Sequence, residues 1–292
     1  MITMEKNTVS SAQKPPIVWD FPVGIPDTKF RKWAKIGAGQ LMLLLKPGLK
    51  DKFFSGHYPK DRYERAALAS LVNNLKKSQD VDHLAKLHQQ IWAKTSGFSA
   101  YESTEELLME VEPYLMKSFD KLLDKSAFKT LVEIGCGTGK FLNYFSEKFP
   151  MIDKFIGIDI SAGQIELNKA KYEHNPRLEF HAGDAIEWLK KNSSTNTVYV
   201  TYGGVLEYFN EDQVNNMLDS MTQHAPAGLV VFEPIADGFD PKKEKHSKVD
   251  GYEFNFSHPY PHFARQAGME IQYEKVFYTD NAWWIILSAV KK

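Results

Sequence analysis

The second half of the chain alternates between strand-like and helix-like segments, and this rhythm is its most constraining feature. After Phe128, short apolar runs rich in β-branched and aromatic residues are separated by stretches with helical spacing. Successive strand–helix units demand right-handed crossovers, which give a mostly parallel sheet covered on both faces. The sequence therefore predicts a doubly wound α/β fold. Strands are expected at 130–134, 155–160, 178–181, 198–201 and 229–232, and helices at 140–149, 164–174, 185–191 and 212–224.

The last segment of the chain departs from this rhythm. A helix is expected over 257–267, closed by Gly268, and it is followed by two strands at 269–278 and 283–290. Because a parallel crossover needs roughly a dozen residues, the short connection Thr279-Asp280-Asn281 requires antiparallel pairing. The sheet is thus expected to end in an antiparallel hairpin.

The first part of the chain has helical periodicity instead. Helices are expected at 28–45, 61–76, 81–94 and 104–125, although Gly37 and Gly39 weaken the first, which Pro47-Gly48 should end. The polar start of the chain lacks periodicity. We therefore expect a disordered tail at 1–16, a helical cap or substrate-binding region at 17–125 and the α/β core at 126–292.

Composition excludes several classes of protein. The formal net charge is -1, so the charge of the whole chain does not favour binding to nucleic acid. Residues 1–65 are basic, however, with 12 Lys or Arg against 6 Asp or Glu. The single cysteine, Cys136, can form neither an internal disulfide nor a cysteine metal cage. The apolar run 41–45 is too short to span a bilayer. A cytoplasmic protein without a membrane span is the expectation.

A glycine-rich loop lies directly between the first expected strand of the core and the helix that begins at Lys140. It reads Glu-Ile-Gly-Cys-Gly-Thr-Gly over residues 133–139. Its three glycines allow a tight turn and close approach of a ligand, and the helix that follows offers free N–H groups. We therefore expect a ligand against this loop.

The spacing of the loop separates two candidate ligands. A dinucleotide fingerprint needs glycine at position 140, where this chain has Lys140, and this opposes a nicotinamide oxidoreductase. An acidic residue at the strand end, Glu133, suits a cationic group and would repel a pyrophosphate. S-adenosylmethionine carries an ammonium group and no phosphate, so it is the predicted cofactor.

Acidic residues also follow the next two strands. Asp159 lies 24 positions after Gly135, near the roughly 20-residue offset at which an acid accepts hydrogen bonds from ribose hydroxyls. Asp184 can accept from an adenine amine. Either aspartate can instead be the N-cap of the helix that follows it. The predicted cofactor-binding residues are Glu133, Gly135, Cys136, Gly137, Gly139, Asp159, Ile160, Gln164, Gly183, Asp184, Ala185 and Tyr202.

These motifs resemble those of the class I S-adenosylmethionine-dependent methyltransferases. The matching elements are EIGCGTG at 133–139, GIDIS at 157–161, GDA at 183–185 and the hairpin at 277–290. The resemblance covers about residues 126–292. It implies a Rossmann-like sheet of seven strands with the last one antiparallel, the cofactor at the carboxyl ends of the first strands, and the acceptor beyond the fourth and fifth strands.

Methyl transfer from a sulfonium needs no nucleophilic side chain, because the protein has to align the acceptor and exclude water. A base helps where the acceptor carries a proton. The catalytic candidates are Glu207, His258, His262 and Tyr202, with Glu233 as a further possible base; capping, packing or a solvated loop position are the alternatives for each. His258 and His262 have the spacing of metal ligands, but no third ligand is evident and no metal is expected.

We therefore expect a methyltransferase that acts on an O, N or C atom of a small organic or peptidic metabolite, as in small-molecule biosynthesis. A protein or RNA methyltransferase, or a non-catalytic scaffold of the same fold, is the alternative. Tyr202, Tyr208, Tyr252, Phe254 and Phe256 can form an aromatic acceptor wall or simply pack in the core. The basic helix at 29–35 can bind an anionic acceptor, a carrier protein or a membrane face, or be the solvated face of a lid. The oligomeric state stays open, with a homodimer as one arrangement.

Overall fold

The computed structural model describes residues 29–94, 100–250, 254–279 and 282–292. The expected tail at 1–16 and Tyr252 lie outside the described residues, as does part of the connection at 279–281.

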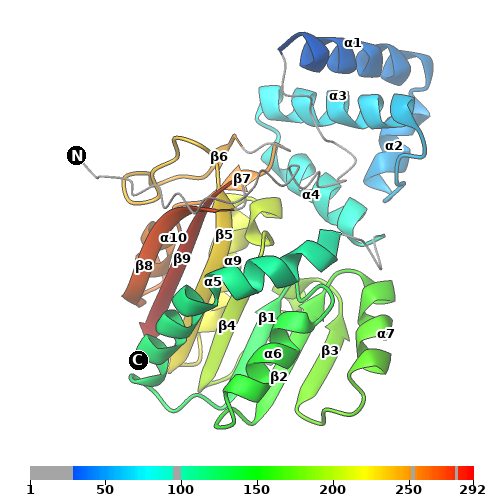
Figure 1. Ribbon diagram of the computed structural model, residues 1–292. Helices are drawn as coiled ribbons and strands as arrows, with labels where there is room; N and C mark the ends of the chain where they lie inside the picture. Colours follow the sequence, from blue (N-terminus) through cyan, green and yellow to red (C-terminus); the bar gives the residue numbers. More distant parts are fainter. Residues whose placement is uncertain (1–28, 95–99, 251–253, 280–281) are drawn as a thin grey trace.

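Seven strands form one sheet in the order β3-β2-β1-β4-β5-β9-β8 (Figure 1). The first five pair in parallel, and β9 pairs antiparallel with both β5 and β8. The predicted doubly wound sheet with a terminal antiparallel hairpin is therefore confirmed. The strands are β1 Thr130–Ile134, β2 Lys154–Asp159, β3 Leu178–Ala182, β4 Thr197–Tyr202, β5 Ala227–Ile235, β8 Glu270–Thr279 and β9 Ala282–Lys291.

Helices cover both faces of this sheet because side chains alternate between the faces along each strand. On one face Leu131 and Val230 pack with α5, α6 and α7; on the other Val132 and Leu229 pack with α8, α9 and α10. Two separate apolar cores result, one on each side of the sheet. The helices are α5 Ala100–Leu123, α6 Lys140–Lys148, α7 Ala162–Lys171, α8 Ala185–Asn192, α9 Glu211–Thr222 and α10 Tyr260–Gln266.

The remaining helices form a third cluster at the edge where the parallel strands end (Figure 1). They are α1 Lys29–Leu45, α2 Gly48–Phe54, α3 Arg62–Ser78 and α4 Val81–Trp92. The first helix continues through its glycines because α1 packs closely on α3: a Cβ on Gly39 would lie 1.9 Å from the backbone oxygen of Ala66. The short helix α2 was not predicted, because Pro47-Gly48 ends one helix and begins another.

The helix expected over 257–267 starts later, at Tyr260. Phe256–Ser257 is instead a short strand, β7, which pairs with β6, Lys248–Val249. The residue before a proline is disfavoured in helical conformation, so Pro259 prevents the helix from beginning at His258. Among the described residues, no helix combines the length and the apolar character that crossing a membrane requires.

Candidate cofactor and acceptor site

The glycine loop joins β1 to α6 at the carboxyl edge of the sheet. Gly135, Gly137 and Gly139 have φ values of 69°, 47° and 70°, which L side chains rarely adopt. A Cβ on Gly135 would lie 2.6 Å from the methyl carbons of Val205, in the loop after β4. The loop therefore lies against the end of β4, and each glycine is required by the backbone.

Glu133, on β1 just before this loop, is 2% exposed. Its Oε2 atom has no hydrogen-bond partner among the described residues. Burial, and secondarily the nearby carboxyl of Asp159, raises the pKa of Glu133 well above its usual range. A buried carboxyl with an oxygen lacking a partner is an acceptor that fits an ammonium group, which donates hydrogen bonds and carries the opposite charge.

Asp159, at the end of β2, supports the glycine loop directly. Its Oδ2 accepts a hydrogen bond of 2.9 Å from the backbone N–H of Gly137, and its Oδ1 accepts one of 2.8 Å from Ser161. Burial raises the pKa of Asp159, and these two bonds oppose that rise. Ser161, not Asp159, is the N-cap of α7. The capping alternative for Asp159 is therefore wrong.

Asp184 is the N-cap of α8, as the alternative interpretation had it. Its Oδ1 accepts hydrogen bonds of 2.8 Å and 3.0 Å from the backbone N–H groups of Ile186 and Glu187. The side chain is exposed, and Ala185 behind it is buried. Gly183 donates its backbone N–H to the backbone oxygen of Asp159 at 2.9 Å, so the ends of β2 and β3 stay together. Ile160, the residue after β2, is half-buried at this same edge.

Asn168, on α7, was not predicted. Its Nδ2 donates to the backbone oxygen of Gly137 at 2.6 Å, and Gln164 donates to its Oδ1 at 2.9 Å. The two side chains are four residues apart on one helix face, and this spacing was the signal available in the sequence. Gln164 therefore reaches the glycine loop through Asn168. Cys136 is buried in the same region, and burial raises the pKa of its thiol.

A second group of buried acids lies at the ends of β4 and β5. Glu233 is fully buried, and its Oε2 accepts hydrogen bonds from the backbone N–H groups of Val205 and Leu206 at 2.8 Å and 3.0 Å. Burial raises the pKa of Glu233 to about 7. Glu207 accepts a hydrogen bond from the side chain of Asn255. Both acids raise the pKa of the Tyr260 hydroxyl, although burial raises it more.

The structure places the other catalytic candidates in different surroundings. His258 is fully buried, with Nδ1 2.6 Å from the hydroxyl of Ser247 and Nε2 2.9 Å from the backbone oxygen of Leu206. Burial lowers the pKa of His258 to about 4, so its ring is neutral near pH 7. Both ring nitrogens already have partners within the chain. His262 is half-buried on α10, beside the ring of Phe263.

Tyr202 ends β4 with its ring between those of Phe141 and Phe232, at 5.0 Å and 5.4 Å. Burial, and then the Glu133 carboxyl, raises the pKa of Tyr202. Tyr208 contacts the helical cluster, since its ring lies 5.4 Å from His88 and 5.5 Å from Trp92. Phe254 and Phe256 pack in the core of that same cluster.

Hydrogen bonds also fix the helical cluster to the end of β4. Gln89 on α4 donates to the backbone oxygen of Tyr208 at 3.1 Å and to Gln213 at 3.2 Å. Asn210 donates to Asp82 at 2.7 Å. The cluster is therefore docked beside the acidic group of Glu207 and Glu233.

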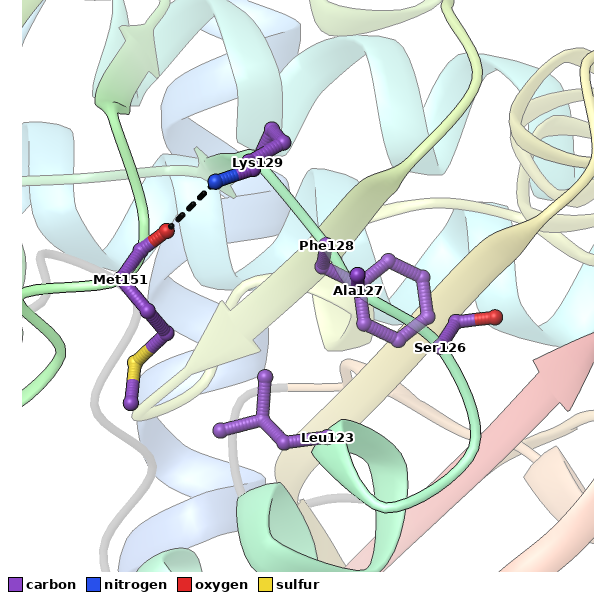
Figure 2. Close-up of a pocket in the computed structure, with 6 residues that line it drawn as sticks. All are labelled: Leu123, Ser126, Ala127, Phe128, Lys129 and Met151. Atoms are coloured by element: carbon purple, nitrogen blue, oxygen red, sulfur yellow. Dashed lines mark hydrogen bonds between the residues drawn. The ribbon is translucent and has the colours of Figure 1, made fainter.

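A separate cavity of about 200 Å³ lies at the opposite edge of the sheet, before β1 and β2 (Figure 2). Ligand pockets usually measure roughly 300–1,000 Å³, and this cavity lacks the acidic residues described above. We therefore do not assign the cofactor to it. Among the described residues, no three His, Cys, Asp or Glu side chains gather as metal ligands. The cavity is lined by Leu123, Ser126, Ala127, Phe128, Lys129 and Met151.

Residues 131–228 match the methyltransferase domain family. These residues form an S-adenosylmethionine-dependent methyltransferase domain. S-adenosylmethionine is accordingly its cofactor, and the unpartnered Glu133 oxygen fits the ammonium group of that molecule. No curated protein matches the sequence.

Solved structures share the fold of this methyltransferase. An S-adenosylmethionine-dependent methyltransferase from Leishmania major has a TM-score of 0.56 and 11% identity, over 71% of this chain and 83% of that one. Geranyl diphosphate C-methyltransferase from Streptomyces coelicolor A3(2), in complex with Mg²⁺, geranyl diphosphate and S-adenosyl-L-homocysteine, has a TM-score of 0.50 and 11% identity. That alignment covers 73% of this chain and 98% of the other.

Proposed function

We propose that this methyltransferase acts on a small organic or peptidic metabolite, bound between the ends of β4 and β5 and the helical cluster. The observation that carries the proposal is the docking of α4 on the segment after β4, through the two hydrogen bonds of Gln89 and the contacts of Tyr208. A helical layer fixed above the carboxyl edge restricts this region to a small acceptor and excludes water.

The cofactor residues follow from the contacts at the glycine loop. Glu133 would hold the ammonium group, because its Oε2 is buried and lacks a partner. Asp159 would accept from the ribose hydroxyls, since a carboxylate accepts about four hydrogen bonds and two are already made. Asp184 would accept from the adenine amine with its second oxygen. Bound S-adenosylmethionine supplies the activated methyl group.

On the acceptor side, the acidic residues have different roles. Glu233 is a positioning residue, because its Oε2 fixes the backbone of Val205 and Leu206. His258 also positions this segment through the Leu206 oxygen. Glu207 and His262 remain the candidate bases; Tyr202, whose ring is packed between two phenylalanines, would shape the floor of the site.

Isotope transfer tests this proposal. The purified protein is incubated with donor labelled in its methyl group and with a cell extract separated into low-mass and macromolecular fractions. We expect label in the low-mass fraction, and at least about tenfold less of it with Glu133→Gln at a donor concentration below saturation. Label in protein or RNA would instead establish a macromolecular acceptor, and strong salt dependence of acceptor binding would favour RNA. Cofactor binding without transfer to any fraction would leave a non-catalytic scaffold.

A further inference from the structure

The outermost helix of the helical cluster, α1, presents a row of large apolar side chains to solvent. Phe30, Trp33 and Leu44 are 75%, 73% and 72% exposed, and Leu41 and Leu45 are also exposed. Positions three or four residues apart share one face of a helix, so these side chains form a single stripe. We call these five residues the α1 stripe. Ordinary exposed hydrophobic residues are scattered singly, whereas these five share one helix face, with Phe30 and Trp33 before Gly37 and the three leucines after it.

The opposite side of α1 is held by the fold. Gly39 lies against Ala66 of α3, and Gln40 accepts a hydrogen bond of 3.1 Å from the hydroxyl of Ser70. The helix is the top layer in Figure 1, with α3 beneath it and the sheet far below. The α1 stripe therefore faces away from the rest of the described residues, on a helix that the cluster fixes in place.

The charges on this helix are all positive, and those in the segment that follows it are mostly positive. Residues 29–52 contain seven Lys or Arg and a single acid, Asp51, and α1 itself contains no acid. Arg31 is exposed near the start of the stripe, and Lys46 and Lys50 are exposed near its end. The apolar row is thus flanked by cations at both ends.

We propose that α1 binds the surface of a membrane that contains anionic lipids. An interfacial helix combines aromatic and leucine residues on one face with nearby Lys and Arg, and it lies in the plane of the headgroups. The 17 residues of α1 give a helix of about 25 Å, which offers one continuous edge to such a plane. Charge complementarity selects this partner.

The same features oppose the other occupants of the surface. A second copy would bring one cationic helix against another, and like charges across an interface are unfavourable. Nucleic acid would engage the cations, but the stripe would contribute little to phosphate binding. Only a partner that is both apolar and anionic contacts the α1 stripe and also pairs with the cations at its ends.

Vesicle flotation with the full chain tests the proposal. Vesicles of phosphatidylcholine containing about one third phosphatidylserine should bind the protein, and pure phosphatidylcholine should bind it more weakly. The double variant Trp33→Ser/Leu44→Ser should lower partitioning by at least about tenfold. The matched control Met109→Ser/Leu167→Ser, which alters residues that are 57% and 53% exposed elsewhere, should leave partitioning unchanged.

Two further measurements address the charges and the competing occupants. Lys46→Gln and Lys50→Gln should each weaken binding to the anionic vesicles about fivefold. The fluorescence of Trp33 is obtained as the difference between the wild type and Trp33→Phe. Acrylamide should quench this fluorescence in solution and should quench it much less when the protein is bound to vesicles. Shielding without vesicles would mean that residues 1–28 or a second copy cover the stripe, and would overturn the proposal. Equal vesicle binding by the double serine variant would do the same.

Discussion

The carboxylate of Glu233 accepts a hydrogen bond of 2.8 Å from the backbone N–H of Val205, and so ties the end of β5 to the loop after β4. The side chain of Val205 in turn lies over Gly135, where a Cβ would come within 2.6 Å of it. The buried acid on the acceptor side is therefore linked to the cofactor loop through one residue.

Replacement of Glu233 should change how stability depends on pH. Its pKa is about 7 in the folded protein and 4.5 in its ordinary state, so the unfolded chain releases this proton at lower pH than the folded one. The contribution to stability is present below pH 4.5 and is lost as pH rises to about 7. Glu233→Gln, which mimics the protonated acid, should not show this loss, and the difference should approach about 3 kcal/mol.

Chemical unfolding at several pH values measures this difference. The control is Glu270→Gln, a change in an exposed acid of β8, which should track the wild type at every pH. Parallel stability curves for the wild type and Glu233→Gln would show that Glu233 does not titrate in this range.

Glu133→Gln should weaken S-adenosylmethionine binding by roughly tenfold to a hundredfold, because it removes a charged partner of the ammonium group. Thermal stability should not fall, since the change also removes a buried ionisable group whose pKa is raised. Wild-type affinity should increase with pH as Glu133 loses its proton. Isothermal titration measures both effects. Glu179→Gln, in a half-buried acid on β3 that pairs with Lys154 at 2.9 Å, is the control, and equal affinity of both variants would reject the assignment.

Gly135→Ala should lower the free energy of unfolding by about 1–3 kcal/mol and prevent cofactor binding, since the new methyl group meets Val205 at a positive φ. Adding Val205→Ala should restore only part of the loss, because the backbone strain remains. At Gly37, inside helix α1, an added Cβ would have no neighbouring atom within 4 Å. Gly37→Ala should therefore raise the free energy of unfolding by up to about 1 kcal/mol. Thermal unfolding distinguishes the three, and a neutral Gly135→Ala would mean that the loop adapts.

Gln89→Ala should loosen the helical cluster from the core, because it removes both hydrogen bonds to the segment after β4. Hydrogen exchange should quicken at residues 206–213 and in α4, while β1 and β4 stay protected. The control is Gln90→Ala, the same substitution at the neighbouring position of α4. It should leave hydrogen exchange unchanged in both segments. Unaltered exchange in Gln89→Ala would place the docking energy in the rings of Tyr208 and Trp92 instead.

Local patterns were reliable where one segment alone decides the structure. β1 was predicted at 130–134 and is found at Thr130–Ile134, because four of its five residues are apolar or β-branched and a glycine loop follows it. The start of α10 was missed, since Phe256–Ser257, expected at the start of the helix, pair instead as β7 with Lys248–Val249 from an earlier segment. Asn168 was missed because its partner is a backbone oxygen of another element, Gly137.

The order of strands and helices, the glycine loop and the acids at the strand ends were determined by the sequence itself, because periodicity and turn chemistry are local properties. Only the tertiary structure decided which of those acids has a buried oxygen without a hydrogen-bond partner. Asp159 is bonded to Gly137 and Asp184 caps its own helix, whereas Glu133 keeps an oxygen without a partner. Burial and hydrogen bonding depend on residues brought together from distant segments, and no pattern within one segment records them.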